Sequence, residues 1–272
     1  MVDLKRPARL RIVTINTAKS DSPYPRRLEL LAQGLRLLDP DVVLLQEAFV
    51  AQDGTANTAA DLGCVLEMAV AYAPARAKTR PFEGRTVLSE SGMAVLTRGP
   101  AAECLAVPLP SAPQDGERIA QVCRIEVEGR PVLIANVHLC YLPGQDQLRN
   151  AELGSLLAHP LLQQDAAARI IAGDFNTALS GLPSLLQGLG RWEIQDCYQL
   201  GGGGMPRATC PTSLPAEQSR CIDFILSAVR AGEQHPAFEQ SRVVLGLPGV
   251  DGVYPSDHRG VMTTLVLDEA TQ

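Results

Sequence analysis

The chain has 272 residues, of which 46% are hydrophobic and 20% are charged, a composition typical of a globular protein that buries a full core. Its formal net charge of −6 argues against a protein that coats nucleic acid regardless of sequence, but it allows an enzyme with a local positive or metal-filled cleft. No repeat, linker or low-complexity tail divides the chain, so we expect one domain over residues 1–272.

The N-terminus lacks the apolar segment and cleavage site of a signal peptide, and no apolar run approaches the ~18 residues of a membrane span. We expect a cytoplasmic protein without stable membrane association, and a monomer. The cysteines are odd in number, scattered and without a C-x-x-C pair, which favours reduced thiols over a disulfide framework or a zinc site. They are Cys64, Cys104, Cys123, Cys140, Cys197, Cys210 and Cys221.

Apolar and β-branched runs predict strands along the whole chain, and apolar residues at helical spacing predict helices between them. Strands outnumber helices by about ten to four, which favours two packed sheets with helices outside. The predicted strands are residues 10–15, 41–45, 91–97, 118–127, 131–139, 170–172, 221–227, 242–247 and 261–267. The predicted helices are residues 26–38, 58–70, 145–158 and 182–189.

A basic segment lies between the second and third of these strands. Residues 73–85 contain two prolines and several cations, which predicts an exposed loop. The loop is either merely solvated or forms a rim that steers phosphate toward a cleft. Its cations are Arg76, Lys78, Arg80 and Arg85.

Small polar or charged side chains stand where several predicted strands end. In the clearest case, the apolar run of residues 170–172 stops at Gly173 and is followed by Asp174 and Asn176. Each such residue alone can be a turn former, and His138 alone can be a satisfied core histidine. Together they indicate a site at the rim of a rigid core. The set is Asn16, Glu47, His138, Asp174, Asn176, Asp223, Asp257 and His258.

The residue types in this set point to a chemistry. Carboxylate and amide oxygens are hard ligands, which suit Mg²⁺ or Mn²⁺ better than zinc. An aspartate beside a histidine fixes the imidazole tautomer and raises its basicity. The combination predicts metal-assisted hydrolysis at phosphorus.

These motifs resemble the endonuclease/exonuclease/phosphatase superfamily, which has the fold of pancreatic-type deoxyribonuclease and includes apurinic endonucleases, neutral sphingomyelinases and inositol polyphosphate phosphatases. The matching pieces follow the family's order and cover nearly the whole chain. They are Ile15-Asn16, Leu45-Gln46-Glu47, Asn136-Val137-His138-Leu139, Gly173-Asp174-Phe175-Asn176, Ile222-Asp223-Phe224-Ile225 and Ser256-Asp257-His258. The resemblance implies a four-layered α/β sandwich, in which helices flank two packed mixed β-sheets and the site lies at one edge of both sheets.

The resemblance also implies roles for the candidate metal ligands. Glu47 would be the principal ligand of a Mg²⁺ or Mn²⁺ cofactor, helped by Asn16 and Asp257. Ala18 stands where apurinic endonucleases place an acid, which removes one metal contact and weakens an apurinic assignment.

The remaining residues take catalytic roles by the same resemblance. Asp174 would orient or deprotonate the attacking water, and Asn176 would hold the transition-state oxygens. His258, paired with Asp223, would be a general base or a phosphate-binding cation, and His138 would contact the phosphate. Whether Asp174 or His258 takes the proton stays open.

We therefore expect a divalent-metal-dependent phosphodiesterase of nuclease type, with a phosphoester substrate for which nucleic acid is a candidate. A phosphomonoesterase, or a hydrolase of phospholipids or inositol phosphates, is the alternative on the same scaffold. The scarcity of Trp and Tyr weakens the sphingomyelinase assignment, and the inositol-phosphatase signatures are missing. A catalytically silent binding module is the remaining alternative from another class.

Overall fold

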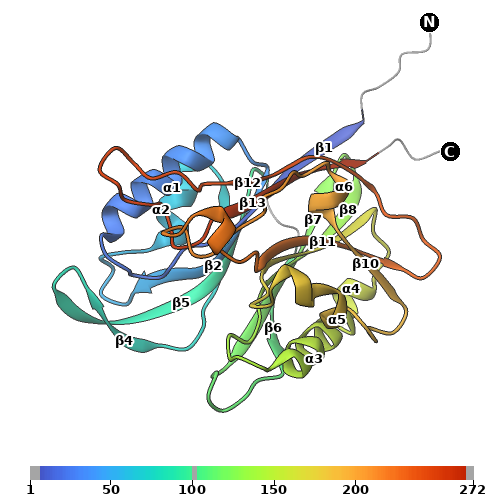
Figure 1. Cartoon of the computed structure of the whole chain (residues 1–272), viewed down its shortest axis with the longest axis horizontal. Helices are drawn as coiled ribbons and strands as arrows, with labels where there is room; N and C mark the ends of the chain where they lie inside the picture. Colours follow the sequence, from blue (N-terminus) through green and yellow to red (C-terminus); the bar gives the residue numbers. More distant parts are fainter. Residues whose placement is uncertain (1–6, 100–102, 268–272) are drawn as a thin grey trace, which may run out of the picture.

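The computed structural model describes residues 7–99 and 103–267, and their strands form two β-sheets that lie face to face (Figure 1). The strands are β1 (Ala8–Asn16), β2 (Val42–Ala51), β3 (Ala69–Ala73), β4 (Lys78–Phe82), β5 (Arg85–Thr97), β6 (Glu103–Leu109), β7 (Arg118–Val127), β8 (Arg130–His138), β9 (Ala168–Asp174), β10 (Trp192–Asp196), β11 (Asp223–Arg230), β12 (Ala237–Val244) and β13 (Gly260–Leu267).

Short and medium helices connect these strands. They are α1 (Tyr24–Leu38), α2 (Thr58–Leu66), α3 (Asp146–Leu157), α4 (Pro160–Gln163), α5 (Leu182–Leu185) and α6 (Cys197–Leu200), with 3₁₀ turns at Leu179–Gly181 and Ala216–Gln218. Within the described residues, no helix is long and apolar enough to cross a membrane.

Both sheets are mixed. The seven-stranded sheet has the order β12-β13-β1-β2-β5-β3, with β4 paired to β5 off this path. The six-stranded sheet has the order β10-β11-β9-β8-β7-β6. The strands β1 and β2 are parallel, as are β8 and β9, whereas the other pairs are antiparallel.

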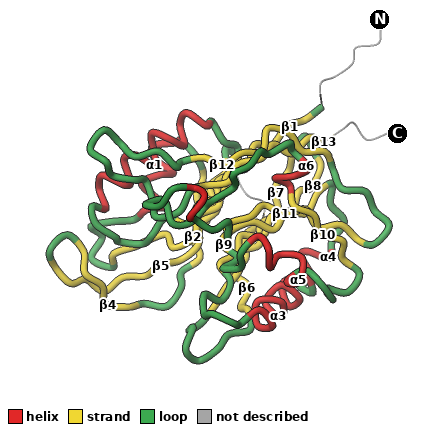
Figure 2. Tube along the Cα trace, viewed as in Figure 1, coloured by secondary structure: helices red, strands yellow, loops and turns green. Residues whose placement is uncertain are grey.

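Three hydrophobic cores separate four layers (Figure 2). One core lies between α1, α2 and the first sheet, one between the two sheets, and one between the second sheet and α3 to α5. Successive side chains of a strand point to opposite faces, so Ile12 enters the core between the sheets and Val13 the core under α1. Burial on both faces explains why these strands read as nearly continuous apolar runs. The predicted α/β sandwich is confirmed.

Several predicted boundaries are wrong. The helix predicted over residues 58–70 ends at Leu66, because Glu67 takes a left-handed conformation with φ 55°, and the chain continues as the edge strand β3. The helix predicted over residues 182–189 is a single turn, α5. The strand predicted over residues 242–247 is β12, which begins five residues earlier, at Ala237.

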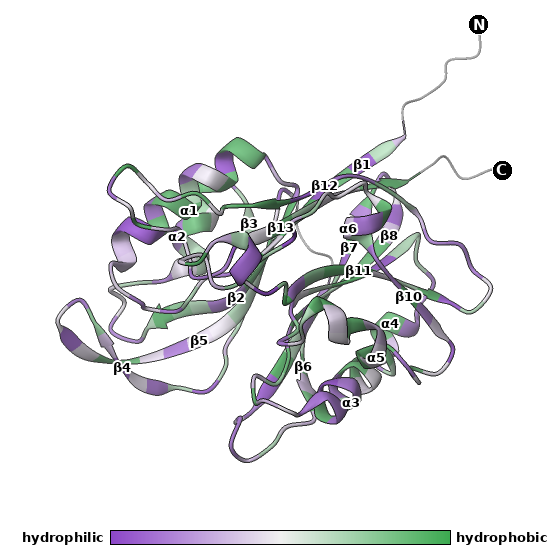
Figure 3. Cartoon of the chain, viewed as in Figure 1, coloured by the Kyte–Doolittle hydropathy of each residue, from purple (hydrophilic) through white to green (hydrophobic). Residues whose placement is uncertain are grey.

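The basic segment is a hairpin rather than a loop. β4 pairs with β5 from Lys78 opposite Ser89 to Phe82 opposite Arg85, and the turn at Glu83 and Gly84 uses two positive φ values, 46° and 76°. Much of β4 is hydrophilic whereas the sheet centres are hydrophobic (Figure 3). The hairpin is nevertheless fixed to the body of the protein, because the Phe82 ring is buried against other aromatic rings. Its ring centroid lies 5.3 Å from that of Tyr24 and 5.1 Å from that of Phe49.

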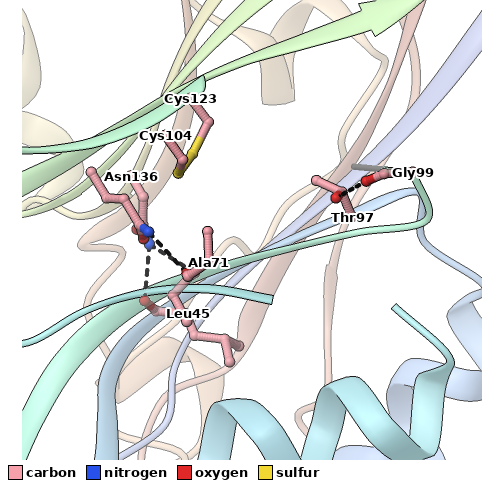
Figure 4. The surroundings of a disulfide bond; sticks show 9 residues. Leu45, Ala71, Thr97, Gly99, Cys104, Cys123 and Asn136 are labelled. Atoms are coloured by element: carbon pink, nitrogen blue, oxygen red, sulfur yellow. Dashed lines mark hydrogen bonds between the residues drawn. A yellow bond between two sulfur atoms is a disulfide. The ribbon is translucent and has the colours of Figure 1, made fainter. Parts of the chain in front are cut away.

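One pair of cysteines contradicts the expectation of reduced thiols. Cys104 on β6 and Cys123 on β7 form a disulfide (Figure 4), since the strand register places them directly opposite each other with their Cα atoms 4.1 Å apart. No strand was predicted at β6, so the sequence did not reveal this pairing. The free cysteines are Cys64, Cys140, Cys197, Cys210 and Cys221.

Candidate active site

Strand register brings three of the predicted residues side by side. Asp174 ends β9, with His138 of β8 and Asp223 of β11 as its partners on the two neighbouring strands. The carboxyl ends of β8 and β9 therefore meet the amino end of β11 at one rim of the second sheet. His258 reaches this rim from the segment just before β13, and Asn16 reaches it from the end of β1.

The Gly-Asp-Phe-Asn stretch has a steric basis. Gly173 has φ 144°, and a Cβ atom there would lie 1.9 Å from the carbonyl oxygen of Val137, so only glycine fits. Phe175 is fully buried, and its ring meets that of Phe224 edge to face with centroids 5.5 Å apart. Glycine thus lets β8 and β9 approach closely, and phenylalanine anchors the turn that presents Asp174.

Asp223 and His258 form a buried pair. The Nδ1 atom of His258 lies 2.9 and 3.1 Å from the two carboxylate oxygens of Asp223, which leaves Nε2 facing Asp174 at 3.8 Å. Burial alone lowers the pKa of His258, but the charge and hydrogen bond of Asp223 outweigh it, and the pKa is raised well above its usual value. The imidazole is therefore oriented and favours its charged form.

Asp174 occupies the centre of the site. It is 2% exposed, and it accepts hydrogen bonds from Asn16 Nδ2 at 3.1 Å and from the Asn176 backbone N–H at 2.9 Å. Imidazole nitrogens of His138 and His258 lie 3.7 and 3.8 Å from its Oδ2 atom. Burial, together with the charge of Asp223, raises the pKa of Asp174 to about 7.

His138 and Asn176 complete the rim. Burial and the nearby charges of Arg118 and Lys19 lower the pKa of His138 well below its usual value, so its imidazole is neutral. The Nδ2 atom of Asn176 donates to the carbonyl of Leu139 at 3.0 Å, which fixes the amide plane beside Asp174.

The comparisons with known proteins bear on this geometry. A family model described as "Endonuclease/Exonuclease/phosphatase family" matches residues 13–258. The chain belongs to this family. Members of the endonuclease/exonuclease/phosphatase family are generally hydrolases that act on phosphoester bonds. No curated protein sequence matches the chain.

Solved structures of the endonuclease/exonuclease/phosphatase fold are similar over nearly the whole chain. A family protein from Leptotrichia buccalis has a TM-score of 0.71 and 18% identity, and the match covers 94% of this chain and 99% of that chain. TDP2 from D. rerio, complexed with single strand DNA product, has a TM-score of 0.70 and 20% identity, with coverages of 94% and 98%. A family protein from Beutenbergia cavernae has a TM-score of 0.71 and 23% identity, with coverages of 96% and 72%.

The three ligands that the sequence predicted for the metal have different surroundings. Glu47 stands at an interruption of the β2–β5 pairing with φ 56°, and its carboxylate forms an ion pair of 2.6 Å with Lys19. The Asn16 side chain is already bonded to Asp174 and to the N–H of Ala18. Asp257 is exposed and lies 3.3 Å from the Ser256 hydroxyl. Their roles as ligands stay predictions.

The structure gathers a different set of potential ligands. Asp174, Asp223 and His258 offer ligand atoms that all lie within 4.8 Å of one another, and all three are buried. Two buried carboxylates side by side are costly unless a cation compensates them, and the raised pKa of Asp174 reflects this cost. With His258 in its neutral form this donor set fits a divalent cation, whereas in its charged form the imidazole itself compensates the two carboxylates. The sequence analysis had assigned these three residues to catalysis rather than to metal binding.

Supporting residues were missed by the sequence analysis. Ser256 donates to the Asn16 carbonyl at 2.6 Å, and its oxygen accepts from the His258 N–H at 3.2 Å, so it joins two arms of the site. The Thr209 hydroxyl accepts from the N–H groups of Ile222 and Asp223 at 3.0 and 3.2 Å. Serine and threonine are too common for this role to be visible in sequence.

A single buried arginine fixes the loop after β1. The Arg27 guanidinium donates to the carbonyls of residues 17, 18, 19, 21 and 255 at 2.8 to 3.4 Å. It thereby ties the segment that carries Lys19 to the segment that precedes Asp257. In sequence, Arg27 looked like one more polar residue of an amphipathic helix.

Proposed function

We propose that this chain is a divalent-metal-dependent phosphodiesterase of nuclease type. The observation that carries the proposal is the buried constellation of Asp174, Asp223 and His258 at a strand rim, in a member of a family of phosphoester hydrolases. The imidazole, carboxylate and amide groups gathered there are the hydrogen-bond donors and acceptors that hydrolysis at phosphorus requires.

Each side chain of the site has a separate role in the proposed hydrolysis. Asp174 accepts the proton of the attacking water, because its pKa of about 7 suits a general base and the charged His258 has no free site for that proton. His258, held by Asp223 through Nδ1, directs Nε2 toward the same space and places positive charge beside the phosphoryl oxygens. The neutral imidazole of His138 and the fixed amide of Asn176 contact those oxygens from the second sheet. The new bond joins the water oxygen to phosphorus, and the ester bond to the leaving group breaks.

Glu47 would hold the cofactor once its pairing with Lys19 opens, helped by Asn16 and Asp257, while Asp174 and Asp223 keep their roles toward the water and His258. Bound Mg²⁺ or Mn²⁺ would act as a Lewis acid that neutralises phosphate charge. Oxygen-rich ligands favour these ions over softer metals.

Metal dependence is tested with chelator-treated protein and two chromogenic substrates. We expect no turnover of bis(p-nitrophenyl) phosphate in EDTA, recovery with Mg²⁺ or Mn²⁺, and slower hydrolysis of the monoester p-nitrophenyl phosphate. Glu47→Gln should raise the metal concentration needed for half-maximal activity, whereas Glu67→Gln, an exposed acid at the end of α2, should not. Full turnover in excess EDTA would sink the proposal, and preference for the monoester would make the chain a phosphomonoesterase.

A further inference from the structure

A pocket of about 300 Å³ extends from the site toward the β4–β5 hairpin. Glu47 and His138 line its inner end, and the connection between β6 and β7 forms the opposite wall with residues 115–118. Three further cations line it, Lys78 and Arg80 of β4 and Arg76 just before β4, and they are called the hairpin cations. Arg85, the fourth cation of the predicted basic loop, lies outside the pocket at the turn end of the hairpin and pairs with Asp53 at 2.6 Å.

Two of the five cations that line this pocket have a carboxylate partner, and the three hairpin cations have none in the described part of the chain. Lys19 pairs with Glu47 and Arg118 pairs with Asp115, each at 2.6 Å. In the described part of the chain, no carboxylate lies within ion-pair distance of the three hairpin cations. Burial and the charges of four neighbouring cations lower the pKa of Lys78, which reports their mutual repulsion. Such clustering in a chain with a net charge of −6 favours the binding of an anion at this place.

One of the three hairpin cations is held in place by hydrogen bonds. The Arg80 guanidinium donates to the Ser89 carbonyl at 2.9 Å and to the Ser91 hydroxyl at 3.0 Å. Arg76 is exposed and lies beside Gly116, where an added Cβ would be 3.3 Å from its Nη1 atom. A guanidinium group that is fixed like that of Arg80 loses little entropy when it binds a phosphate.

We propose that Arg76, Lys78 and Arg80 form a second phosphate subsite, which binds a phosphate of the substrate other than the one that reacts. This inference rests on the proposed function and names its substrate class, a phosphoester that carries at least two phosphates on one organic chain. Consecutive nucleotides of a single strand have this form, and so do small bisphosphorylated molecules.

The pocket also offers a surface for the organic part of such a substrate. Tyr141 is 54% exposed at the pocket wall, and the Arg118 guanidinium covers its ring at 5.6 Å. Aromatic rings of this kind stack on nucleobases without sequence preference. The volume suits one nucleotide-sized group and is too small to enclose a duplex.

A matched pair of substrates isolates the second phosphate. Thymidine 5′-(p-nitrophenyl phosphate) has one phosphate, and its 3′-phosphorylated derivative has two. We expect the 3′-phosphate to raise kcat/KM by about tenfold or more, the value of one charge-assisted contact. The hairpin variant, which combines Arg76→Gln with Lys78→Gln, should erase this advantage and leave kcat/KM for the substrate with one phosphate unchanged. Arg80 is kept, because its bonds to Ser89 and Ser91 support the hairpin.

The control removes two cations outside the pocket, Arg85→Gln with Arg124→Gln, and should keep the advantage. With a short oligothymidylate, the hairpin variant should also reduce the log–log salt slope of kcat/KM by about 1.4, or ~0.7 per lost contact. A higher kcat/KM for the oligothymidylate than for the 3′-phosphorylated thymidine substrate identifies a single strand as the source of the second phosphate. A higher kcat/KM for the 3′-phosphorylated thymidine substrate identifies a small molecule. An advantage that survives in the hairpin variant, or equal loss on both thymidine substrates, overturns the subsite.

Binding separates this inference from the proposed function. The affinity for thymidine 3′,5′-bisphosphate is measured by calorimetry in EDTA, where turnover is not needed. The hairpin variant should bind it about tenfold or more weakly, whereas the affinity for thymidine 5′-phosphate should not change. If the chain hydrolyses no phosphoester but this difference is found, the proposed function fails and the subsite stands. An unchanged affinity for the bisphosphate rejects the subsite whatever the activity.

Discussion

Individual side chains at the rim are oriented by partners that engage one of their polar atoms and direct another toward the site. His258 gives Nδ1 to Asp223 and turns Nε2 toward Asp174, while Asn176 gives an amide N–H to the Leu139 carbonyl. Such fixed partners lower the cost of reaching the reactive geometry, because little reorientation is left for the substrate to induce. The consequence is that Asp223 acts through His258 and not through the substrate.

Asp223 and His258 should therefore behave as one unit in kinetics. His258→Ala is expected to lower kcat by about 10²–10⁴-fold, the usual contribution of an acid–base group. Asp223→Asn should lower it through the same imidazole, and the double variant should be little worse than the more severe single one. The measurement is kcat for all three variants at saturating metal and diester. Losses that multiply would contradict the pairing.

The helix α3 supports the segment that follows His138. The Glu152 carboxylate accepts from the N–H of Cys140 at 3.0 Å, and Arg149 donates to the carbonyls of Cys140 and Leu142 at 2.8 and 3.0 Å. Glu152 is fully buried, and this burial raises its pKa to about 7 from an ordinary value of 4.5. The helix thus holds the rim in place with a carboxyl group that prefers to be protonated.

The raised pKa of Glu152 makes stability depend on pH. The folded protein holds this proton more tightly than the unfolded chain, so the contribution is full below pH 4.5 and is lost as pH rises through about 7. Glu152→Gln keeps an acceptor for Cys140 but cannot ionise. It should therefore flatten the decline of the unfolding free energy between these pH values by up to about 3 kcal/mol. Urea denaturation at several pH values measures this, and parallel pH profiles for the two proteins would refute it.

The sequence was most informative for elements with a strong local pattern. The helix α1 and the central strands were predicted because each has a long apolar period or run. The edge strands β3, β4 and β6 were missed, since they are short, half-exposed and stabilised by pairing with a distant segment. The disulfide depended on the register of such an edge strand, so it could not be found either.

The candidate site was predictable in its composition but not in its contacts. The residues at strand ends were identified, and the structure brings Asn16, His138, Asp174, Asp223 and His258 together. The ion pair of Lys19 with Glu47 was not foreseen, because it joins the loop after β1 to strand β2, which only the fold places side by side. Hydrogen bonds between the sheets were equally invisible, since no periodic pattern marks a buried amide.

The two halves of the molecule are joined by such amides across their common core. Asn136 of β8 donates to the carbonyls of Leu45 and Ala94 in the other sheet at 2.9 and 3.1 Å, and accepts from Gln46 at 2.7 Å (Figure 4 shows its contact with Leu45). These contacts lie where the β2–β5 pairing is interrupted just before Glu47. Asn136 therefore holds the strand that presents Glu47 against the sheet that presents Asp174.

This junction can be tested against a second one, which contacts β3 of the other sheet and not the strand that carries Glu47. Asn136→Ala removes the side-chain donor to two buried carbonyls and one acceptor of the Gln46 amide, which keeps its bonds to Thr14 and Leu44, so it should lower the unfolding free energy by at least about 2 kcal/mol. It should also reduce kcat/KM, because Glu47 loses its support. Gln121 lies opposite Asn136 on β7 and likewise spans the sheets, but it donates to the Ala71 carbonyl of β3 at 2.9 Å and not to β2, so Gln121→Ala should lower stability and spare activity. Urea denaturation measures the unfolding free energy, and diester hydrolysis by folded protein measures kcat/KM. Equal kcat/KM values for the two variants would show that Asn136 contributes to stability alone.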